Sequence, residues 1–306
     1  MSTNRCLFIL ICSIAMVFLS TFQISAQSML KEGATPVVIT EGYEFTEGPF
    51  WHPNGYLLFS DIPANTIYKW DPKAQGAQKF LKPSGHSNGI TMDAKGRLII
   101  SQHDGTVSAL NDTSLVVLAS EFDGKRLNSP NDAAVKSDGT IYFTDPPFGV
   151  SEKDKELDVN GVYRIARDGQ VELLYDGLSR PNGIVFSPDE KKLYVNDSSD
   201  GRVLVFDVTT DGNVSLPTDF ANVGAADSTG AADGMVVDAE GRLYSTGPGG
   251  VYVFKKSGEL MEKIPIPARA TNLEWGRKGE QELFISTPDA IYRLQMSSDG
   301  PDGTKK

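Results

Sequence analysis

Six side chains that can bind a cation recur at one position of a sequence repeat. Counting back ten residues from the apolar residue that opens the second half of each copy, or eleven where the intervening turn is longer, always reaches an oxygen donor. These residues are Glu47, Asn88, Asn131, Asn182, Asp233 and Asn272. Carboxylate and carboxamide oxygens suit calcium, and two carboxylates would balance a divalent charge. The pattern therefore predicts a site for one divalent cation.

The same residues also have a plainer interpretation. Asn-Gly and Asp-Gly are common turn dipeptides, so any one of them alone is better explained as a turn than as a ligand. Agreement in register across all six copies favours the cation site. Calcium is the first candidate for this cation. Magnesium and manganese use similar donors, and zinc is less favoured because no His or Cys belongs to the set.

The repeat itself predicts the fold. Each copy reads as a short apolar run, a turn rich in Asp, Gly, Pro or Lys, and a second apolar run that is often followed by a third. Such a pattern is typical of a β-meander, whose short strands cannot bury their faces alone. Six meanders set around an axis can, so residues 27–296 are predicted to form an all-β, six-bladed β-propeller. A β-helix or a sandwich fits the hairpin turns and the number of copies less well.

In a propeller the first strand of every blade lines the axis. The six ring residues, defined here as Glu47, Asn88, Asn131, Asn182, Asp233 and Asn272, should therefore converge in one channel. They are the residues around which a functional site is expected.

The two ends of the chain differ from the repeat. Arg5 precedes an apolar run from Cys6 to Phe22, and the small residue Ala26 closes this stretch, so residues 1–26 are predicted to be a signal peptide. A membrane anchor is the alternative. The protein is accordingly expected to be exported, to the periplasm or outside the cell, with no membrane association after cleavage. The polar residues 297–306 are predicted to be a disordered tail.

Composition excludes several kinds of site. Both cysteines, Cys6 and Cys12, lie in the leader, so the mature chain should contain no disulfide and no thiolate metal site. The formal net charge of −11 leaves no electrostatic footprint for nucleic acid. A GxSxG elbow, a His-rich zinc motif and a phosphate-binding Gly loop are all absent from the sequence.

Four short segments resemble one protein family. They are EGP at Glu47, LNSPND ending at Asp132, RPNG at residues 180–183 and ADGM at residues 232–235, and together they resemble the SMP-30/gluconolactonase/regucalcin-like family, above all its gluconolactonase branch. The resemblance covers nearly the whole mature chain. It implies a six-bladed propeller that binds a divalent metal and hydrolyses sugar lactones or, in related phosphotriesterases, organophosphates.

The resemblance also implies roles for individual residues. Glu47, Asn182 and Asp233 match the metal ligands of the family, and Asn131 matches a residue that binds substrate or also ligates metal. Asp233 matches the proposed general base or nucleophile. Ser129 stands where some animal members have an Arg, so their sugar contacts are not carried over.

The expected activity is metal-dependent hydrolysis of a lactone, a small-molecule substrate such as gluconolactone. Asp233 is the expected catalytic residue, although hydroxide on the cation could take its role. Asn131, Asn88, Asn272 and His103 are candidate substrate ligands, and a surface turn explains His103 equally well. Asp145 and Asp197 are weaker candidates. A phosphotriesterase and a non-catalytic calcium- or ligand-binding propeller are the alternatives, and the sequence does not define the oligomeric state.

Overall fold

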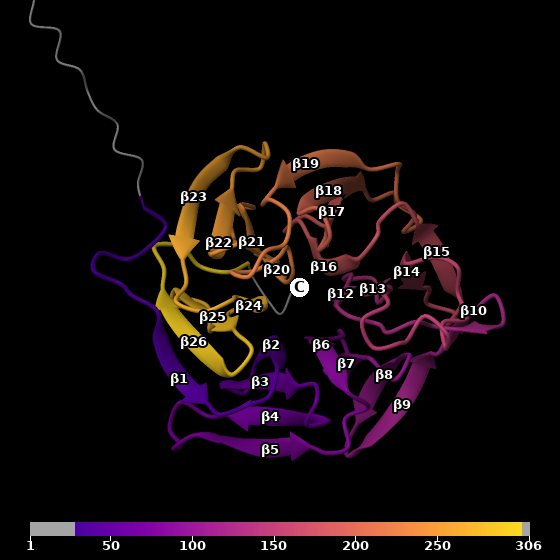
Figure 1. Cartoon of the computed structure of the whole chain (residues 1–306), viewed down its shortest axis with the longest axis horizontal. Helices are drawn as coiled ribbons and strands as arrows, with labels where there is room; N and C mark the ends of the chain where they lie inside the picture. Colours follow the sequence, from indigo (N-terminus) through magenta and orange to yellow (C-terminus); the bar gives the residue numbers. More distant parts are fainter. Residues whose placement is uncertain (1–27, 302–306) are drawn as a thin grey trace, which may run out of the picture.

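The computed structural model describes residues 28–301. In this part of the chain six four-stranded antiparallel sheets surround a central axis, and one short hairpin lies outside them (Figure 1). The predicted all-β, six-bladed propeller is thereby confirmed. Residues 1–26, the predicted signal peptide, lie outside the described residues. Between residues 28 and 301 there is no helix long and apolar enough to cross a membrane.

The blades follow one another along the chain. Blade 1 consists of β2 (Thr46–His52), β3 (Tyr56–Asp61), β4 (Thr66–Trp70) and β5 (Ala77–Leu81). Blade 2 consists of β6 (Ser87–Met92), β7 (Leu98–Gln102), β8 (Thr106–Asn111) and β9 (Ser114–Ala119). Blade 3 consists of β12 (Ala133–Val135), β13 (Ile141–Asp145), β14 (Gly161–Ile165) and β15 (Val171–Tyr175). The hairpin of β10 (Glu121–Phe122) and β11 (Lys125–Arg126) precedes it.

The second half of the propeller repeats this order. Blade 4 consists of β16 (Pro181–Phe186), β17 (Lys192–Asp197), β18 (Arg202–Asp207) and β19 (Thr218–Asn222). Blade 5 consists of β20 (Met235–Val237), β21 (Leu243–Gly247), β22 (Gly250–Phe254) and β23 (Leu260–Pro265). Blade 6 consists of β24 (Asn272–Trp275), β25 (Glu282–Ser286), β26 (Ala290–Gln295) and, from the other end of the chain, β1 (Val37–Glu41).

Blade 6 closes the ring by joining the two ends of the chain. Strand β1 pairs antiparallel with β26, so that Val37 lies opposite Arg293. Leu30 forms a further bridge to Met296, and Met29 is only 2% exposed. The sequence repeat did not indicate this closure, because β1 precedes the first copy of the repeat.

The segment after Ser297 differs from the expected disordered tail. The backbone N–H of Ser297 donates to the carbonyl oxygen of Met29 at 2.8 Å, and Ser298 is buried. Asp299 accepts backbone hydrogen bonds from Gly279 and Gln281. These contacts hold the start of the tail against blade 6, whereas residues 302–306 lie outside the described residues.

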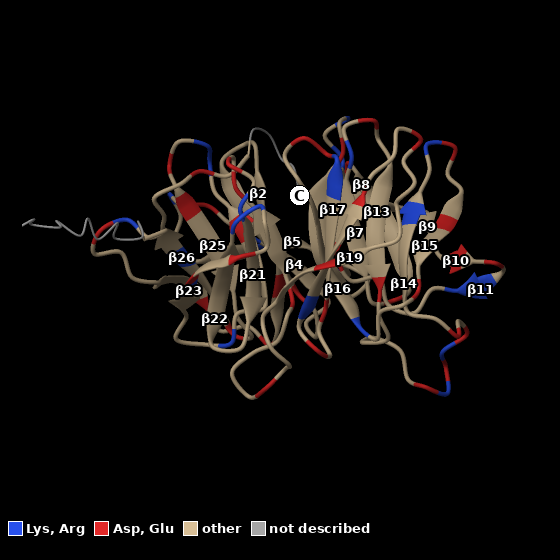
Figure 2. Ribbon diagram, turned by 90° about the horizontal axis from the view of Figure 1, so that it is seen from above, with Lys and Arg blue, Asp and Glu red and all other residues tan. Residues whose placement is uncertain are grey.

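The apolar core lies between neighbouring blades. In one cluster Ile99 and Val107 of blade 2 pack with Phe143 and Tyr163 of blade 3, and all four are fully buried. Comparable clusters join the other blades in turn. Charged residues are instead frequent on the turns at the two ends of the propeller (Figure 2). Sheet-against-sheet burial thus places the first strand of every blade at the axis (Figure 1).

Candidate active site

The glycines that follow the ring residues allow adjacent blades to approach closely at the axis. A Cβ atom on Gly183 would lie 2.3 Å from the carbonyl oxygen of Asp233, and one on Gly234 would lie 1.9 Å from Oδ1 of Asn272. Neither glycine has a positive φ. These Asn-Gly and Asp-Gly pairs are therefore not turns, because the glycine provides space for the next blade.

Irregular strand pairing turns several ring residues toward the axis. The register between the first two strands shifts between Glu47 and Phe50 in blade 1 and between Pro181 and Ile184 in blade 4. Bulges of this kind redirect side chains and are frequent beside active sites. In blade 5 the first strand begins only at Met235, so Asp233 lies on the segment that leads into it.

The structure brings most of the predicted site residues together around one cavity of about 560 Å³. Its walls include five of the six ring residues together with His103, namely Glu47, Asn88, Asn131, Asn182 and Asp233. All five are at most 7% exposed. The cavity could admit a small cyclic ester to a site that is otherwise buried.

Asn272 occupies a different place from the one predicted. It does not line this cavity, and both polar atoms of its side chain have partners. Its Nδ2 donates to Oε2 of Glu47 at 2.9 Å, and its Oδ1 accepts the backbone N–H of Leu273 at 2.8 Å. Asn272 therefore supports Glu47, whose Oε2 also accepts the N–H of Gly48.

A hydrogen-bond chain sets the orientation of Asn182. The Ser198 hydroxyl donates to the carbonyl oxygen of Ala232 at 2.7 Å, so it must accept from Nδ2 of Asn182 at 2.9 Å. This arrangement leaves Oδ1 of Asn182 buried with no hydrogen-bond partner in the part of the chain that the structure describes. An unpartnered buried carbonyl oxygen is costly, and a cation would satisfy it.

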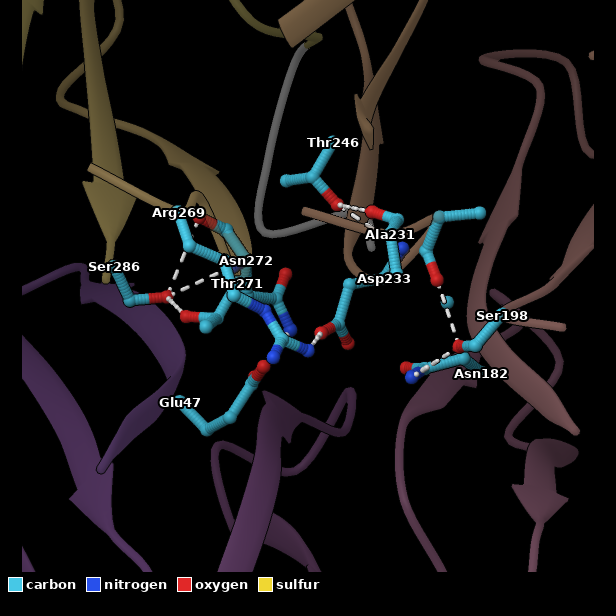
Figure 3. A network of polar contacts seen from close by, with 12 residues as sticks. Glu47, Asn182, Ser198, Ala231, Asp233, Thr246, Arg269, Thr271, Asn272 and Ser286 are labelled. Atoms are coloured by element: carbon cyan, nitrogen blue, oxygen red, sulfur yellow. Dashed lines mark hydrogen bonds and ion pairs between the residues drawn. The ribbon is translucent and has the colours of Figure 1, made fainter. Parts of the chain in front are cut away.

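Two carboxylates share the same buried space. Burial and the charge of Glu47 raise the pKa of Asp233 well above its usual value, whereas Arg269 and Asn182 act in the opposite direction. Figure 3 shows Glu47, Asn182 and Asp233 around a common space, with the Arg269 guanidinium beside Asp233. A divalent cation would remove the repulsion between the two carboxylates. Donor chemistry and charge both fit such an ion.

The expected ligand set combines carboxylates with amides and so differs from a cluster of His, Cys, Asp and Glu side chains. Within residues 28–301, no three His, Cys, Asp or Glu side chains come together as a metal-binding group. The residues that fit a hard cation are instead two carboxylates, Glu47 and Asp233, with the amides of Asn131 and Asn182.

His103 lines the cavity, so it does more than form a surface turn. Its Nε2 is 3.1 Å from Nδ2 of Asn88, and because an amide nitrogen only donates, the imidazole nitrogen accepts. Burial lowers the pKa of His103 to about 4. A neutral His103 therefore positions Asn88 on the cavity wall.

Asp145 and Asp197, the two weaker candidates for substrate contact, hold backbone segments in place. Asp145 accepts the backbone N–H groups of Asn128 and Ser129, and Asp197 accepts those of Ser179 and Arg180. Each carboxylate thus holds the segment that enters the first strand of its blade. Neither residue lines the cavity, so the expectation that they contact substrate does not agree with their positions.

Sequence reasoning missed several wall residues. Arg269, Phe148, Glu44 and Ser198 line the cavity, as does Arg180, which the sequence showed only as part of a family motif. Arg269 Nη2 lies 3.9 Å from Oδ2 of Asp233. These positions do recur in the repeat: Glu44 and Arg269 each lie three residues before a ring residue, and Ser198 matches His103. The residue types at these positions differ from copy to copy, so a search for repeated oxygen donors did not identify them.

Comparison with known proteins agrees with this architecture. Residues 45–289 match the SMP-30/gluconolactonase/LRE-like region. A gluconolactonase of Zymomonas mobilis is 37% identical over 87% of this chain and 83% of its own length. The solved structure of a gluconolactonase from Xanthomonas campestris is 32% identical, with a TM-score of 0.78 over 88% of this chain and 91% of its own. Regucalcin of Xenopus laevis is 26% identical over 82% of this chain and 85% of its own. The chain therefore belongs to the SMP-30/gluconolactonase/LRE-like family.

Proposed function

We propose that this protein is a metal-dependent lactone hydrolase that opens a sugar lactone, such as gluconolactone, to the hydroxy acid. The observation that carries the proposal is the buried pair of Glu47 and Asp233, beside the unpartnered Oδ1 of Asn182, on the wall of a cavity large enough for a sugar. The similarity to two gluconolactonases supports the substrate class.

Glu47, Asn131, Asn182 and Asp233 would hold the cation, with calcium as the first candidate and magnesium, manganese or zinc as alternatives. When bound, it would supply Lewis acidity toward the ester carbonyl. Asp233 would take a proton from the attacking water, because its carboxylate lies on the cavity wall beside the other expected ligands of the cation. Asn88, positioned by His103, would hydrogen-bond a substrate hydroxyl.

The test measures proton release from D-glucono-1,5-lactone and other aldonolactones, with calcium, with zinc and after chelation. We expect turnover that depends on a divalent cation and is lost in Asp233→Asn. The matched control is Asp219→Asn, since Asp219 is exposed on β19, the outermost strand of blade 4, and does not line the cavity. Circular dichroism would verify that both variants fold.

Three outcomes would contradict the proposal. Full activity in Asp233→Asn would exclude Asp233 as the base. Cation binding without turnover of any lactone would favour a binding protein, and turnover of a phosphotriester alone would favour a phosphotriesterase.

We also propose that the chain is exported to the periplasm or outside the cell, on the strength of the leader sequence at residues 1–26. Met29 is buried and Ser28 donates to Glu262. Cleavage after Ala26 would therefore leave these contacts in place. N-terminal sequencing of protein recovered from a periplasmic extract checks this, and an intact leader on all of the protein would contradict it.

A further inference from the structure

Two arginines on the cavity wall have no role in the activity proposed above. Arg180 lies just before β16 in blade 4, and Arg269 lies between β23 and β24. Both line the same cavity as Glu47 and Asp233. Binding the hydroxyl groups of a neutral sugar needs no positive charge, so two guanidinium groups here call for an explanation.

Arg269 is held close to the expected reaction centre. Its neighbours Ala270 and Thr271 are fully buried, and the Thr271 hydroxyl donates to the carbonyl oxygen of Thr46 at 2.9 Å. The segment is therefore fixed, and the guanidinium lies 3.9 Å from the Asp233 carboxylate (Figure 3). Hydrolysis of any lactone creates one carboxylate at this end of the cavity. Arg269 is placed to pair with that new charge.

Arg180 is held on a different segment of the wall. Its N–H donates to Oδ1 of Asp197 at 3.2 Å, and its carbonyl oxygen accepts the N–H of Ser198 at 3.0 Å. Its guanidinium carbon lies 5.8 Å from the centre of the Phe148 ring. Arg180 is exposed, and within residues 28–301 its side chain forms no ion pair. Its guanidinium is therefore available to an anionic ligand of the cavity.

The charges of the wall favour an anion once the cation is bound. A divalent ion would offset Glu47 and Asp233, and the neutral His103 adds no charge. Among the described residues that line the cavity, Glu44 is then the one negative charge that the cation does not offset, and Arg180 and Arg269 carry two positive charges. If Arg269 pairs with the carboxylate formed by hydrolysis, Arg180 is left for a second anionic group.

We propose, on the basis of the lactone hydrolase function, that the preferred substrate is a sugar lactone carrying a second anionic group, a carboxylate or a phosphate, and that Arg180 is the residue that selects it. A guanidinium pairs with either group through two parallel hydrogen bonds. The reaction is unchanged: water adds to the ester carbonyl, the ring C–O bond breaks, and the ring oxygen leaves as a hydroxyl.

The experiment compares kcat/KM for three lactones with the calcium-loaded protein: neutral glucono-1,5-lactone, glucaro-1,4-lactone with a free carboxylate, and 6-phosphoglucono-1,5-lactone. We expect at least one anionic lactone to be preferred. Arg180→Gln should lower kcat/KM for it by about tenfold or more, the size of a lost charge-assisted hydrogen bond, and should lower kcat/KM for the neutral lactone much less. Comparison of the two anionic lactones identifies the group.

Further variants separate this role from a general loss of function. Arg269→Gln should slow all three lactones, because each produces a carboxylate. Arg180→Lys keeps the charge but not the paired donors, so it should retain part of the preference. Arg277→Gln is the control, since Arg277 is exposed and paired with Glu280 outside the cavity. The preference should also weaken as ionic strength rises.

The outcomes distinguish this inference from the function on which it rests. If the neutral lactone is preferred, or if Arg180→Gln alters all three lactones equally, the assignment of Arg180 is wrong while the lactone hydrolase stands. If the wild-type protein turns over none of the three, both proposals fail together.

Discussion

Replacing Gly183 by alanine should damage both the propeller and the cation site. The added Cβ would lie 2.3 Å from the carbonyl oxygen of Asp233 and 3.1 Å from the N atom of Met235. Both are backbone atoms and no side chain can rotate away, so blades 4 and 5 must separate at the axis. This movement would also break the hydrogen bond from the Gly183 N–H to the Asp233 carbonyl, which is 3.1 Å long.

The loss in the free energy of unfolding is the sum of three contributions. Overpacking costs about 1–3 kcal/mol, the lost hydrogen bond adds about 1 kcal/mol, and the stiffer unfolded chain returns about 0.4–1 kcal/mol. The net loss is about 2 kcal/mol, which at roughly 2–4 °C per kcal/mol lowers Tm by about 4–8 °C. Because Asp233 moves with its carbonyl group, the rise in Tm on adding calcium should also shrink.

The assay is thermal unfolding followed by circular dichroism, with chelator and with calcium. Gly169→Ala is the control: its Cβ meets no atom within 4 Å, although its φ of +89° makes alanine unfavourable by about 1 kcal/mol. The control should lose some stability and keep the full calcium response. An unchanged Tm and an unchanged calcium response in Gly183→Ala would refute the argument that glycine is required for close approach of the blades.

Three other predictions concern the site and the closure of the ring. Ser198→Ala removes the partner that orients Asn182, so calcium affinity measured by titration calorimetry should fall by about 10–100-fold, whereas the exposed neighbour Ser199→Ala should not change it. Because the pKa of Asp233 is raised in the folded state, its contribution to stability is present at low pH and is lost as the pH rises through that pKa. In chelator, Tm of the wild type should therefore fall relative to Asp233→Asn as the pH rises above the usual pKa range of an Asp carboxyl, and parallel curves would contradict the raised pKa. Met29→Ala should cost about 2–5 kcal/mol in urea unfolding, because Met29 is 2% exposed in the core beside blade 6; an unchanged midpoint would show that this segment does not contribute to closure.

The propeller could be predicted because its evidence is local and repeated. Each blade encodes its own short strands and tight turns, and Leu57, Leu98 and Ile141 mark the same place in successive copies. Ring closure could not be predicted in this way. Strand β1 pairs with β26 more than two hundred residues later, and pairing at that distance depends on the whole ring having formed.

The functional site could likewise be predicted only in part. A side chain at one position of the innermost segment of every blade points the same way, so the repeat alone predicted that Glu47, Asn131, Asn182 and Asp233 would meet at the axis. What each polar group contacts depends on how the blades pack together. Asn272 shares the repeat position of Asn182, yet its amide supports Glu47, while Arg269 reaches Asp233 from a position where blade 1 has Glu44. The partner of a buried polar group is supplied by neighbouring blades, and such contacts between separate segments leave no periodic trace in the chain.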